Sequence, residues 1–392
     1  MVYVKFCIRN SSSGSLRQFR WISEGKKIGD YSNQVGMADN WQTLLSGLLW
    51  RGKIIMDDVF VWLTHYGREA LSDALPGFLG GVCESDARLD DKVAVITGCS
   101  AGIGKITALE FCKRGARVIM ACRDLEKAQK AADIIIKKAA QFGNPGQVIV
   151  RKLDLASFKS VRECANQILA TEEKVHILVN NAGVYCPWKL TEDGQDILYQ
   201  TNFLAHFLFT MLLLPRIISA APARIINVSS LLYTWGDKET NTDMAPRKKS
   251  YSTFYAYARS KLAVILFTKK LSEKLRGLDV TTYAVHPGFV QTGIFREIDT
   301  TIHPIVQRIL ESSMSRLLFL KSPWQGAQTT LHCALAERAG KESGLYYSDC
   351  RPRKPVRKAR DKQNAESLWN FSWNVVGLPE DYDPIHRSRS SD

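Results

Sequence analysis

The chain has 392 residues, a formal net charge of +14 and 45% hydrophobic residues, a composition typical of a globular protein with a substantial core. Its nine cysteines form no C-x-x-C pair and are irregularly spaced, which argues against both a disulfide framework and a zinc site, so no metal is expected. No run of about 18 uncharged apolar residues is found. The shorter apolar run from Phe203 to Leu214 is predicted to be a buried core helix.

The first 88 residues differ in pattern from the rest of the chain. Residues 1–40 lack periodicity and are predicted to be a disordered extension. Their start is rich in Arg and Ser and poor in acids, so a mitochondrial transit peptide is one alternative, and a start near Met37 is another. Residues 41–88 mix aromatic, aliphatic and charged residues, which predicts an amphipathic helical segment followed by a Gly- and Pro-containing linker.

Short apolar runs alternate with longer helical stretches from residue 89 to residue 350. The runs predict strands at Lys92–Thr97, Arg117–Cys122, Gln147–Leu153, Val175–Val179, Ala223–Val228 and Val280–Val285. Helices are predicted after the first two strands and then at Ser157–Leu169, Thr191–Ile218 and Phe254–Leu275. Continuously apolar strands that alternate with helices predict an α/β fold, a single Rossmann-type doubly wound parallel sheet with helices on both faces. Residues 351–392 are predicted to form a basic stretch and a C-terminal helix or tail.

A glycine-rich turn, TGCSAGIG, follows the first predicted strand and starts with Thr97. Glycines at such a junction allow a sharp turn, close approach of a pyrophosphate and packing of the following helix. The start of that helix offers free N–H groups to phosphate. We therefore predict a dinucleotide site here, with an ordinary strand-to-helix turn as the alternative.

The second predicted strand ends at Cys122 and is followed by Arg123 and Asp124. An acidic residue at the tip of this strand would bind the ribose of NAD, whereas a guanidinium suits a 2′-phosphate. The sequence therefore predicts NADP(H) in preference to NAD(H), unless Arg123 is only a surface charge. Asp124 also suits a helix N-cap. Asp154, which follows the third strand, is predicted to accept a hydrogen bond from the adenine amino group or to cap the next helix.

Tyr257 and Lys261 are four residues apart in a helical stretch and so share one helix face. An ammonium group one turn away is expected to lower the pKa of the phenol, which is ordinarily about 10. Tyr257 could then exchange a proton with an alcohol or carbonyl oxygen while hydride moves to or from a nicotinamide. Asn202 lies in an otherwise apolar helix, where an unpaired amide would be costly.

The motifs TGCSAGIG, NNAG, Asn202, VSS, YARSK and HPG occur in this order, and together they resemble the short-chain dehydrogenase/reductase superfamily over residues 89–350. The resemblance implies that Ser230 polarises the substrate oxygen and that Tyr257 is the acid/base. It also implies that Lys261 binds the nicotinamide ribose and tunes Tyr257, and that Asn202 holds a water in a proton relay. Choosing Ser230 over Ser229 follows the family motif alone. The resemblance further implies that Gly98, Gly102, Ile103 and Gly104 meet the pyrophosphate. The other cofactor contacts that it implies are Ser100, Asn181, Ala182, Gly183, Tyr257, Lys261, Pro287, Gly288 and Thr292.

Several longer motifs are similar to the retinol dehydrogenase-like branch of that superfamily. They are ACRD, LTEDG, YARSKLAVILFTKKL, HPGFVQT and QGAQTTLHCAL, and the similarity extends to about residue 379. The branch implies an enzyme that interconverts a lipophilic, retinol-like alcohol and its carbonyl with NADP(H). Steroid or fatty-aldehyde turnover is one alternative, and a non-catalytic dinucleotide-binding scaffold is another. Residues from Gly293 to Lys321 are expected to cover the substrate, although their apolar residues equally suit helix packing.

Six basic residues between Arg351 and Arg360 have no acidic residue among them. They lack interleaved aromatic residues and any nucleic-acid motif, so nucleic acid is not expected as a partner. Peripheral contact with an anionic membrane, shared with residues 41–63, is one interpretation, and a solvated loop is the other. Family resemblance suggests a homodimer. The expected location is the cytoplasm or the surface of the endoplasmic reticulum, with mitochondria as the alternative.

Overall fold

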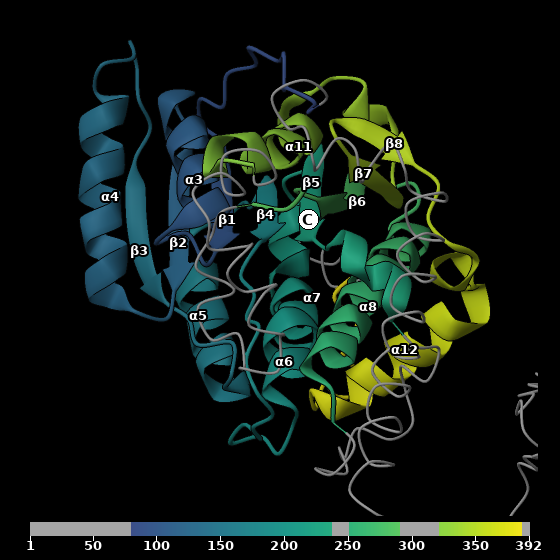
Figure 1. Ribbon diagram of the computed structural model, residues 1–392. Coiled ribbons are helices and arrows are strands. Elements are labelled where there is room, and N and C mark those ends of the chain that lie inside the picture. The colour runs from purple at the N-terminus through teal and green to yellow at the C-terminus, as the bar shows by residue number, and fades with distance from the viewer. Residues whose placement is uncertain (1–79, 237–250, 291–320, 386–392) are drawn as a thin grey trace, which may run out of the picture. The chain divides into compact units, whose positions relative to one another are not determined.

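The computed structural model describes residues 80–236, 251–290 and 321–385. They form an eight-stranded sheet with a layer of helices on each face, as the sequence predicted (Figure 1). The expectations for residues 1–79, for Thr292 and for the covering segment up to residue 320 lie outside the described residues.

The strand order is β3-β2-β1-β4-β5-β6-β7-β8, and every neighbouring pair is parallel except β7 and β8. The strands are β1 (Val93–Thr97), β2 (Arg117–Cys122), β3 (Val148–Lys152), β4 (Ile177–Asn180), β5 (Ala223–Val228), β6 (Val280–His286), β7 (Leu345–Ser348) and β8 (Arg351–Arg353). The chain order reverses between β1 and β4, so the carboxyl ends of these strands flank a topological switch point. Ligands bind at such points in open parallel sheets.

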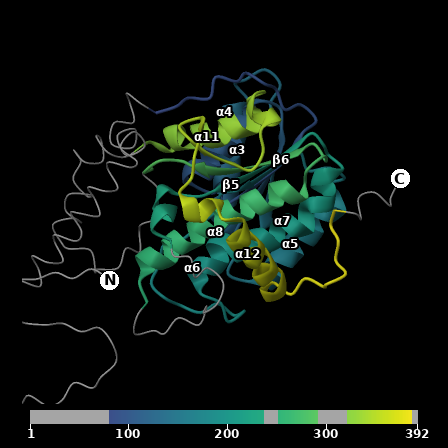
Figure 2. The same ribbon diagram turned by 90° about the vertical axis from the view of Figure 1, so that its right-hand side faces the viewer.

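Successive side chains of a strand enter two separate cores, one under each helix layer. In β1, Val95 belongs to one buried cluster, whereas Ala94 and Ile96 belong to the other. Figure 2 shows the two layers on opposite sides of the sheet. One layer consists of α3 (Gly102–Lys113), α4 (Leu125–Ala139) and α11 (Pro323–Leu335), and the other of α5 (Phe158–Thr171), α7 (Ala205–Ile218), α8 (Thr253–Lys274) and α12 (Lys362–Val375).

The long helix expected from Thr191 to Ile218 starts later than predicted. Residues 191–195 form a turn that contains Gly194 at a φ of +74°, and the helix begins at Ile197. Its N-cap is Asp196, whose Oδ1 accepts hydrogen bonds from the Leu198 and Tyr199 amides at 2.7 and 3.1 Å. The helix comprises α6 (Ile197–Tyr199), a π-helical segment, η1 (Gln200–Leu204), and α7.

The combined helix Ile197–Ile218 is long and apolar enough to cross a bilayer, but 89% of its most apolar window is buried inside the protein. Helices with this burial pattern form the cores of soluble domains as well. The prediction of a buried core helix from Phe203 to Leu214 is therefore confirmed.

Strands β7 and β8 were not predicted from the sequence. The first residues of the basic stretch form β8, which closes the sheet as an antiparallel edge, and residues Arg357–Arg360 form a 3-10 turn, η6. The interpretation of this stretch as a plain solvated loop is therefore wrong for β8. Exposed Arg351 and Pro352 on an edge strand hinder pairing with other chains. The predicted C-terminal helix is confirmed as α12.

Candidate active site

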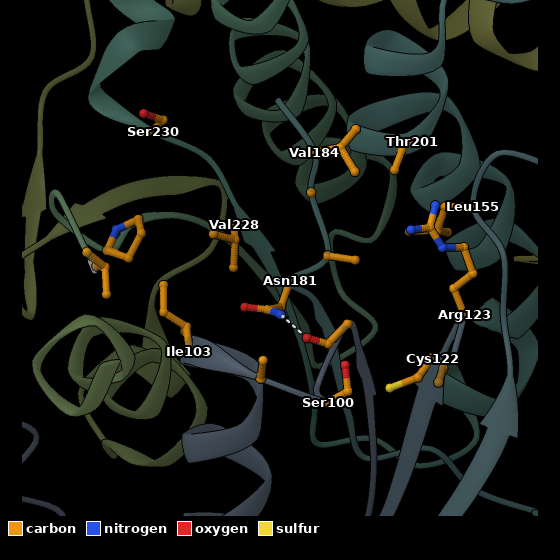
Figure 3. Close-up of a pocket in the computed structure, with 18 of the residues that line it drawn as sticks. Ser100, Ile103, Cys122, Arg123, Leu155, Asn181, Val184, Thr201, Val228 and Ser230 are labelled. Carbon is orange, nitrogen blue, oxygen red and sulfur yellow. Dashed lines mark hydrogen bonds between the residues drawn. The ribbon is translucent and has the colours of Figure 1, made fainter. Parts of the chain in front are cut away.

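A cavity of about 530 Å³ opens at the carboxyl ends of β1, β2, β4, β5 and β6, within the usual size range for small-molecule sites. Ser230 and Arg123 lie on opposite sides of it (Figure 3). Gly104 and Asn202 lie behind its wall, and Thr292 lies outside the described residues. The predicted site residues that line the cavity are Gly98, Ser100, Gly102, Ile103, Arg123, Asp154, Asn181, Ala182, Gly183, Ser230, Tyr257, Lys261, Pro287 and Gly288.

The glycine turn brings the chain close to the loop that follows β4. Gly98 and Gly102 have φ angles of +66° and +57°, a region that glycine adopts without strain. A Cβ added to Gly98 would lie 2.7 Å from the Cβ of Ala182. A Cβ on Gly104 would lie 2.6 Å from Nδ2 of Asn181. Gly104 therefore allows the helix to pack on this loop, which differs from the direct pyrophosphate contact expected for it.

The N-terminus of α3 is suited to an anion. Its N-cap, Ala101, has no side chain that could accept a hydrogen bond from the first turn, and that turn contains no acidic residue. The first amide groups of a helix have no partner within the helix and carry a partial positive charge. Ala101, Gly102 and Ile103 line the cavity, so a dinucleotide pyrophosphate fits this wall of the site.

Two basic residues, Arg123 and Lys127, line the end of the cavity next to β2. Arg123 is exposed, and it lines the cavity together with Cys122, Asp124 and Lys127. The Asp124 carboxylate accepts a hydrogen bond from the Lys127 amide at 3.0 Å and lies 2.8 Å from Lys127 Nζ. It therefore caps α4, as the sequence suggested, and its charge is paired.

Asp154 lies at the same end of the cavity but does not cap a helix. Its Oδ1 accepts a hydrogen bond from the Ala156 amide at 3.0 Å. The N-cap of α5 is Ser157, whose hydroxyl accepts from the Ser160 amide at 3.2 Å. The capping alternative for Asp154 is therefore wrong, and its carboxylate lines the cavity.

Tyr257 and Lys261 lie side by side on α8 and are almost fully buried, with Lys261 Nζ 5.5 Å from the centre of the Tyr257 ring. Burial lowers the pKa of Lys261 to about 8, and its ammonium group donates a hydrogen bond to the Val228 carbonyl at 3.0 Å. Burial also raises the pKa of Tyr257, and this effect exceeds the lowering produced by its hydrogen bond with Ser230. The four-residue spacing led us to expect a lowered pKa for Tyr257, and this expectation is wrong for the protein without cofactor. Removal of the phenol from water favours its neutral form more than the neighbouring groups favour the phenolate.

The two serines after β5 have different partners. The Ser229 hydroxyl is buried and donates to the Lys261 carbonyl at 2.9 Å. Ser230 and Tyr257 both line the cavity, and their hydroxyls are hydrogen-bonded to each other. The Ser230 hydroxyl also accepts a hydrogen bond from the Leu232 amide at 3.2 Å. A substrate oxygen in the cavity could therefore meet the hydroxyls of Ser230 and Tyr257 together.

Asn202 connects the loop after β4 with α8 rather than entering the cavity. Its side chain accepts from the Val184 amide at 2.8 Å and donates to the Val184 carbonyl at 3.0 Å. Its Nδ2 also donates to the Ser260 hydroxyl at 3.2 Å, and Ser260 donates to the Tyr257 carbonyl at 2.7 Å. The side-chain amide of Asn202 is therefore hydrogen-bonded, and the cost of an unpaired amide in an apolar helix does not arise.

Sequence reasoning missed several apolar and aromatic groups near Tyr257. The ring of Tyr185 makes an edge contact with Tyr257, with 5.4 Å between ring centres. Tyr185 closely follows the NNAG motif, which is the one signal that could have identified it. The unpredicted apolar lining residues include Leu155, Val184, Val228, Leu232, Phe289 and Val290.

Comparisons with known proteins identify the family of this chain. Residues 92–303 match the model of the short chain dehydrogenase family. A solved protein from Mycobacterium paratuberculosis, 30% identical, superposes with a TM-score of 0.59 over 76% of this chain and 97% of its own. The chain therefore belongs to the short-chain dehydrogenase family and is an oxidoreductase.

Two relatives indicate which branch of the family the chain belongs to. The chain is 46% identical over 302 residues to retinol dehydrogenase 12 of Bos taurus, covering 77% of this chain and 91% of that protein. It is 44% identical over 302 residues to retinol dehydrogenase 11 of Homo sapiens, with the same coverage. Within the family, the chain thus falls in the retinol dehydrogenase-like branch.

Proposed function

We propose that this protein is an NADP(H)-dependent oxidoreductase that interconverts a lipophilic, retinol-like alcohol and its carbonyl. One arrangement carries the proposal. A single cavity has Ser230, Tyr257 and Lys261 at one end and Arg123 with Lys127 at the other. A dinucleotide could therefore bind with its phosphates at the α3 N-terminus and its nicotinamide beside Tyr257. The retinol dehydrogenases among the relatives support a retinoid-like substrate.

In the direction of reduction, a nicotinamide dinucleotide bound in the cavity would supply the hydride for the carbonyl carbon. The hydroxyls of Ser230 and Tyr257 hold the carbonyl oxygen, and Tyr257 donates its proton to that oxygen. The raised pKa of Tyr257 keeps the phenol protonated at neutral pH, which suits this role. The ammonium group of Lys261 stabilises the phenolate that remains.

The preference for NADP(H) rests on charge at the end of the cavity near β2. Arg123 and Lys127 can both approach a 2′-phosphate there. The carboxylate that would otherwise compete for the ribose, Asp124, accepts a hydrogen bond from the Lys127 amide and is paired with the Lys127 ammonium group. A lipophilic substrate is supported by the apolar groups around Tyr257, including Val184, Tyr185 and Leu232.

We also propose contact with an anionic membrane, at the endoplasmic reticulum surface, through the basic stretch. Arg351, Arg357 and Arg360 are exposed along β8 and η6. Each basic residue near an anionic surface contributes roughly 1 kcal/mol of attraction. Binding to vesicles that contain phosphatidylserine, and its loss in the triple Arg-to-Gln variant, would test this contact.

Purified protein assayed with NADPH and separately with NADH tests the function directly. The substrates are all-trans-retinal and a panel of aliphatic aldehydes, and the control is Tyr257→Phe. We expect retinal-dependent oxidation of NADPH that exceeds that of NADH and is lost in the variant. Dinucleotide binding without turnover of any carbonyl would favour the non-catalytic scaffold instead.

A further inference from the structure

A buried polar chain lies behind the cavity and contains a histidine that the proposed reaction does not use. His206 on α7 is 4% exposed, and its Nε2 lies 2.9 Å from Oγ1 of Thr97, the last residue of β1. The same Thr97 oxygen accepts hydrogen bonds from the Asn181 and Ala182 amides, each at 2.9 Å. Asn181 and Ala182 line the dinucleotide cavity, so Thr97 joins the first strand to the cavity wall.

This pattern of donors fixes the tautomer of His206. The two acceptor positions of the Thr97 hydroxyl are occupied by amide hydrogens, so its own hydrogen is free to point only toward His206. The His206 Nε2 then accepts, and the hydrogen of the neutral ring must be on Nδ1. That nitrogen lies 3.4 Å from the Asn202 carbonyl oxygen. Burial lowers the pKa of His206 to about 3, and the nearby charge of Lys261 acts in the same direction, so the ring is neutral at pH 7.

The two ring nitrogens therefore serve different parts of the site. Through Thr97, Nε2 faces the loop that borders the dinucleotide. Through Nδ1, the ring holds the backbone of Asn202, whose side chain connects Val184 to Ser260 on the catalytic helix. A charged ring would present a second donor to Thr97 and break this pattern.

We propose that His206 is a positioning residue that links the dinucleotide wall to the catalytic helix through its two ring nitrogens. Nε2 fixes the Thr97 hydroxyl and with it the amides of Asn181 and Ala182. Nδ1 fixes the Asn202 carbonyl. The inference rests on the proposed function, since its consequences are for cofactor binding and turnover. A substitution that replaces only one of the two ring nitrogens should therefore change cofactor affinity or kcat, but not both.

Two substitutions in the full chain test this separation. In His206→Gln, the amide oxygen can replace Nε2 as the acceptor for Thr97, but nothing replaces the Nδ1 donor. We expect unchanged NADPH affinity and kcat with retinal lowered about tenfold, the scale of one lost hydrogen bond. In His206→Asn, the amide N–H can replace Nδ1 and the acceptor is lost. We expect NADPH affinity lowered about tenfold and kcat at saturating NADPH close to that of the native protein.

If the His206 ring only fills space, both variants should lose NADPH affinity and kcat together. These losses should then follow the loss of thermal stability measured on the same samples. That outcome would overturn the proposal. Thr97 offers a second route if both variants fail to fold. Thr97→Ser keeps the hydroxyl and should keep NADPH affinity, whereas Thr97→Val removes it and should weaken binding about tenfold. Equal affinities for these two variants would also contradict the proposal.

The native protein provides a test that needs neither a His206 variant nor a substrate. The chain has seven histidines, so ¹⁵N imidazole spectra at pH 7 can be assigned, with the His206 signals identified by their change in Thr97→Val. We expect a protonated Nδ1 and a bare Nε2, and a protonated Nε2 would refute the proposal. If the tautomer and the NADPH affinities are as expected but no carbonyl is reduced, the role of His206 is retained and the proposed function is rejected.

Discussion

Replacing Gly98 by alanine should damage cofactor binding much more than a similar change elsewhere. Gly98 has a φ of +66°, which costs an L-residue about 1–2 kcal/mol. Its new Cβ would also lie 2.7 Å from the Cβ and 2.8 Å from the Cα of Ala182. Overpacking of this kind costs about 1–3 kcal/mol, so the total loss of stability should be about 2–5 kcal/mol. Because Ala182 lines the cavity, its displacement should also distort the site.

Gly277 provides the matched control for this experiment. Its φ is +85°, but a Cβ added there meets no atom within 4 Å. Gly277→Ala should therefore lose only about 1–2 kcal/mol in urea unfolding and bind NADPH as the native protein does. Gly98→Ala should lose more stability and at least tenfold in NADPH affinity, measured by fluorescence of the bound nucleotide. Equal affinities of the two variants would refute the role assigned to Gly98.

Three further predictions concern ion pairs, pH and the cofactor. Asp349 and Lys321 form a buried ion pair at 2.8 Å, so Asp349→Asn should lower the free energy of unfolding by about 3 kcal/mol. Glu337 forms an exposed pair with Lys341, so Glu337→Gln should change the free energy of unfolding by less than about 0.5 kcal/mol. Equal losses in the two variants would contradict the effect of burial. His176 accepts a hydrogen bond from a backbone amide, and burial lowers its pKa to about 4, so the unfolded chain takes up a proton that the folded chain does not. Stability should therefore fall as the pH decreases from about 6.5 to 4, by up to about 1.4 kcal/mol per pH unit, and urea unfolding should show a smaller fall in His176→Gln. Arg123→Ala should weaken NADPH binding about tenfold in titrations and leave NADH binding unchanged, and equal losses for both nucleotides would reject the 2′-phosphate contact.

The sequence predicts the part of the cavity around the glycine turn well, because its signals are local. A strand, a glycine turn and a helix are contiguous in the chain, so the position of Gly98 and Gly102 between a predicted strand and a predicted helix placed them at the cavity that the structure shows. Arg123 follows the neighbouring strand directly. The helix start at Ile197 was not predicted, because the hydrophobic pattern of the sequence did not indicate the turn at residues 191–195. Asp196 is the N-cap of the helix that follows this turn.

The remaining features depend on contacts between distant segments. The pKa of Tyr257 is set mainly by burial, and its neighbour Tyr185 is 72 positions away in the chain. Gly104 and Asn202 belong to family motifs, but their contacts with the loop after β4 join separate segments of the chain and could not be predicted from those motifs. Strand β7 pairs with β6 across nearly 60 residues, so no local pattern specifies that pairing.

Transfer of deuterium from labelled NADPH tests the central claim most directly. The purified protein is incubated with all-trans-retinal and NADPH deuterated at one or the other position of nicotinamide C4, and the retinol formed is analysed by mass spectrometry. We expect retinol that carries one deuterium from one of the two labels, and none from either label with Tyr257→Phe. Absence of deuterated retinol with both labels, in protein that binds NADPH, would contradict the claim.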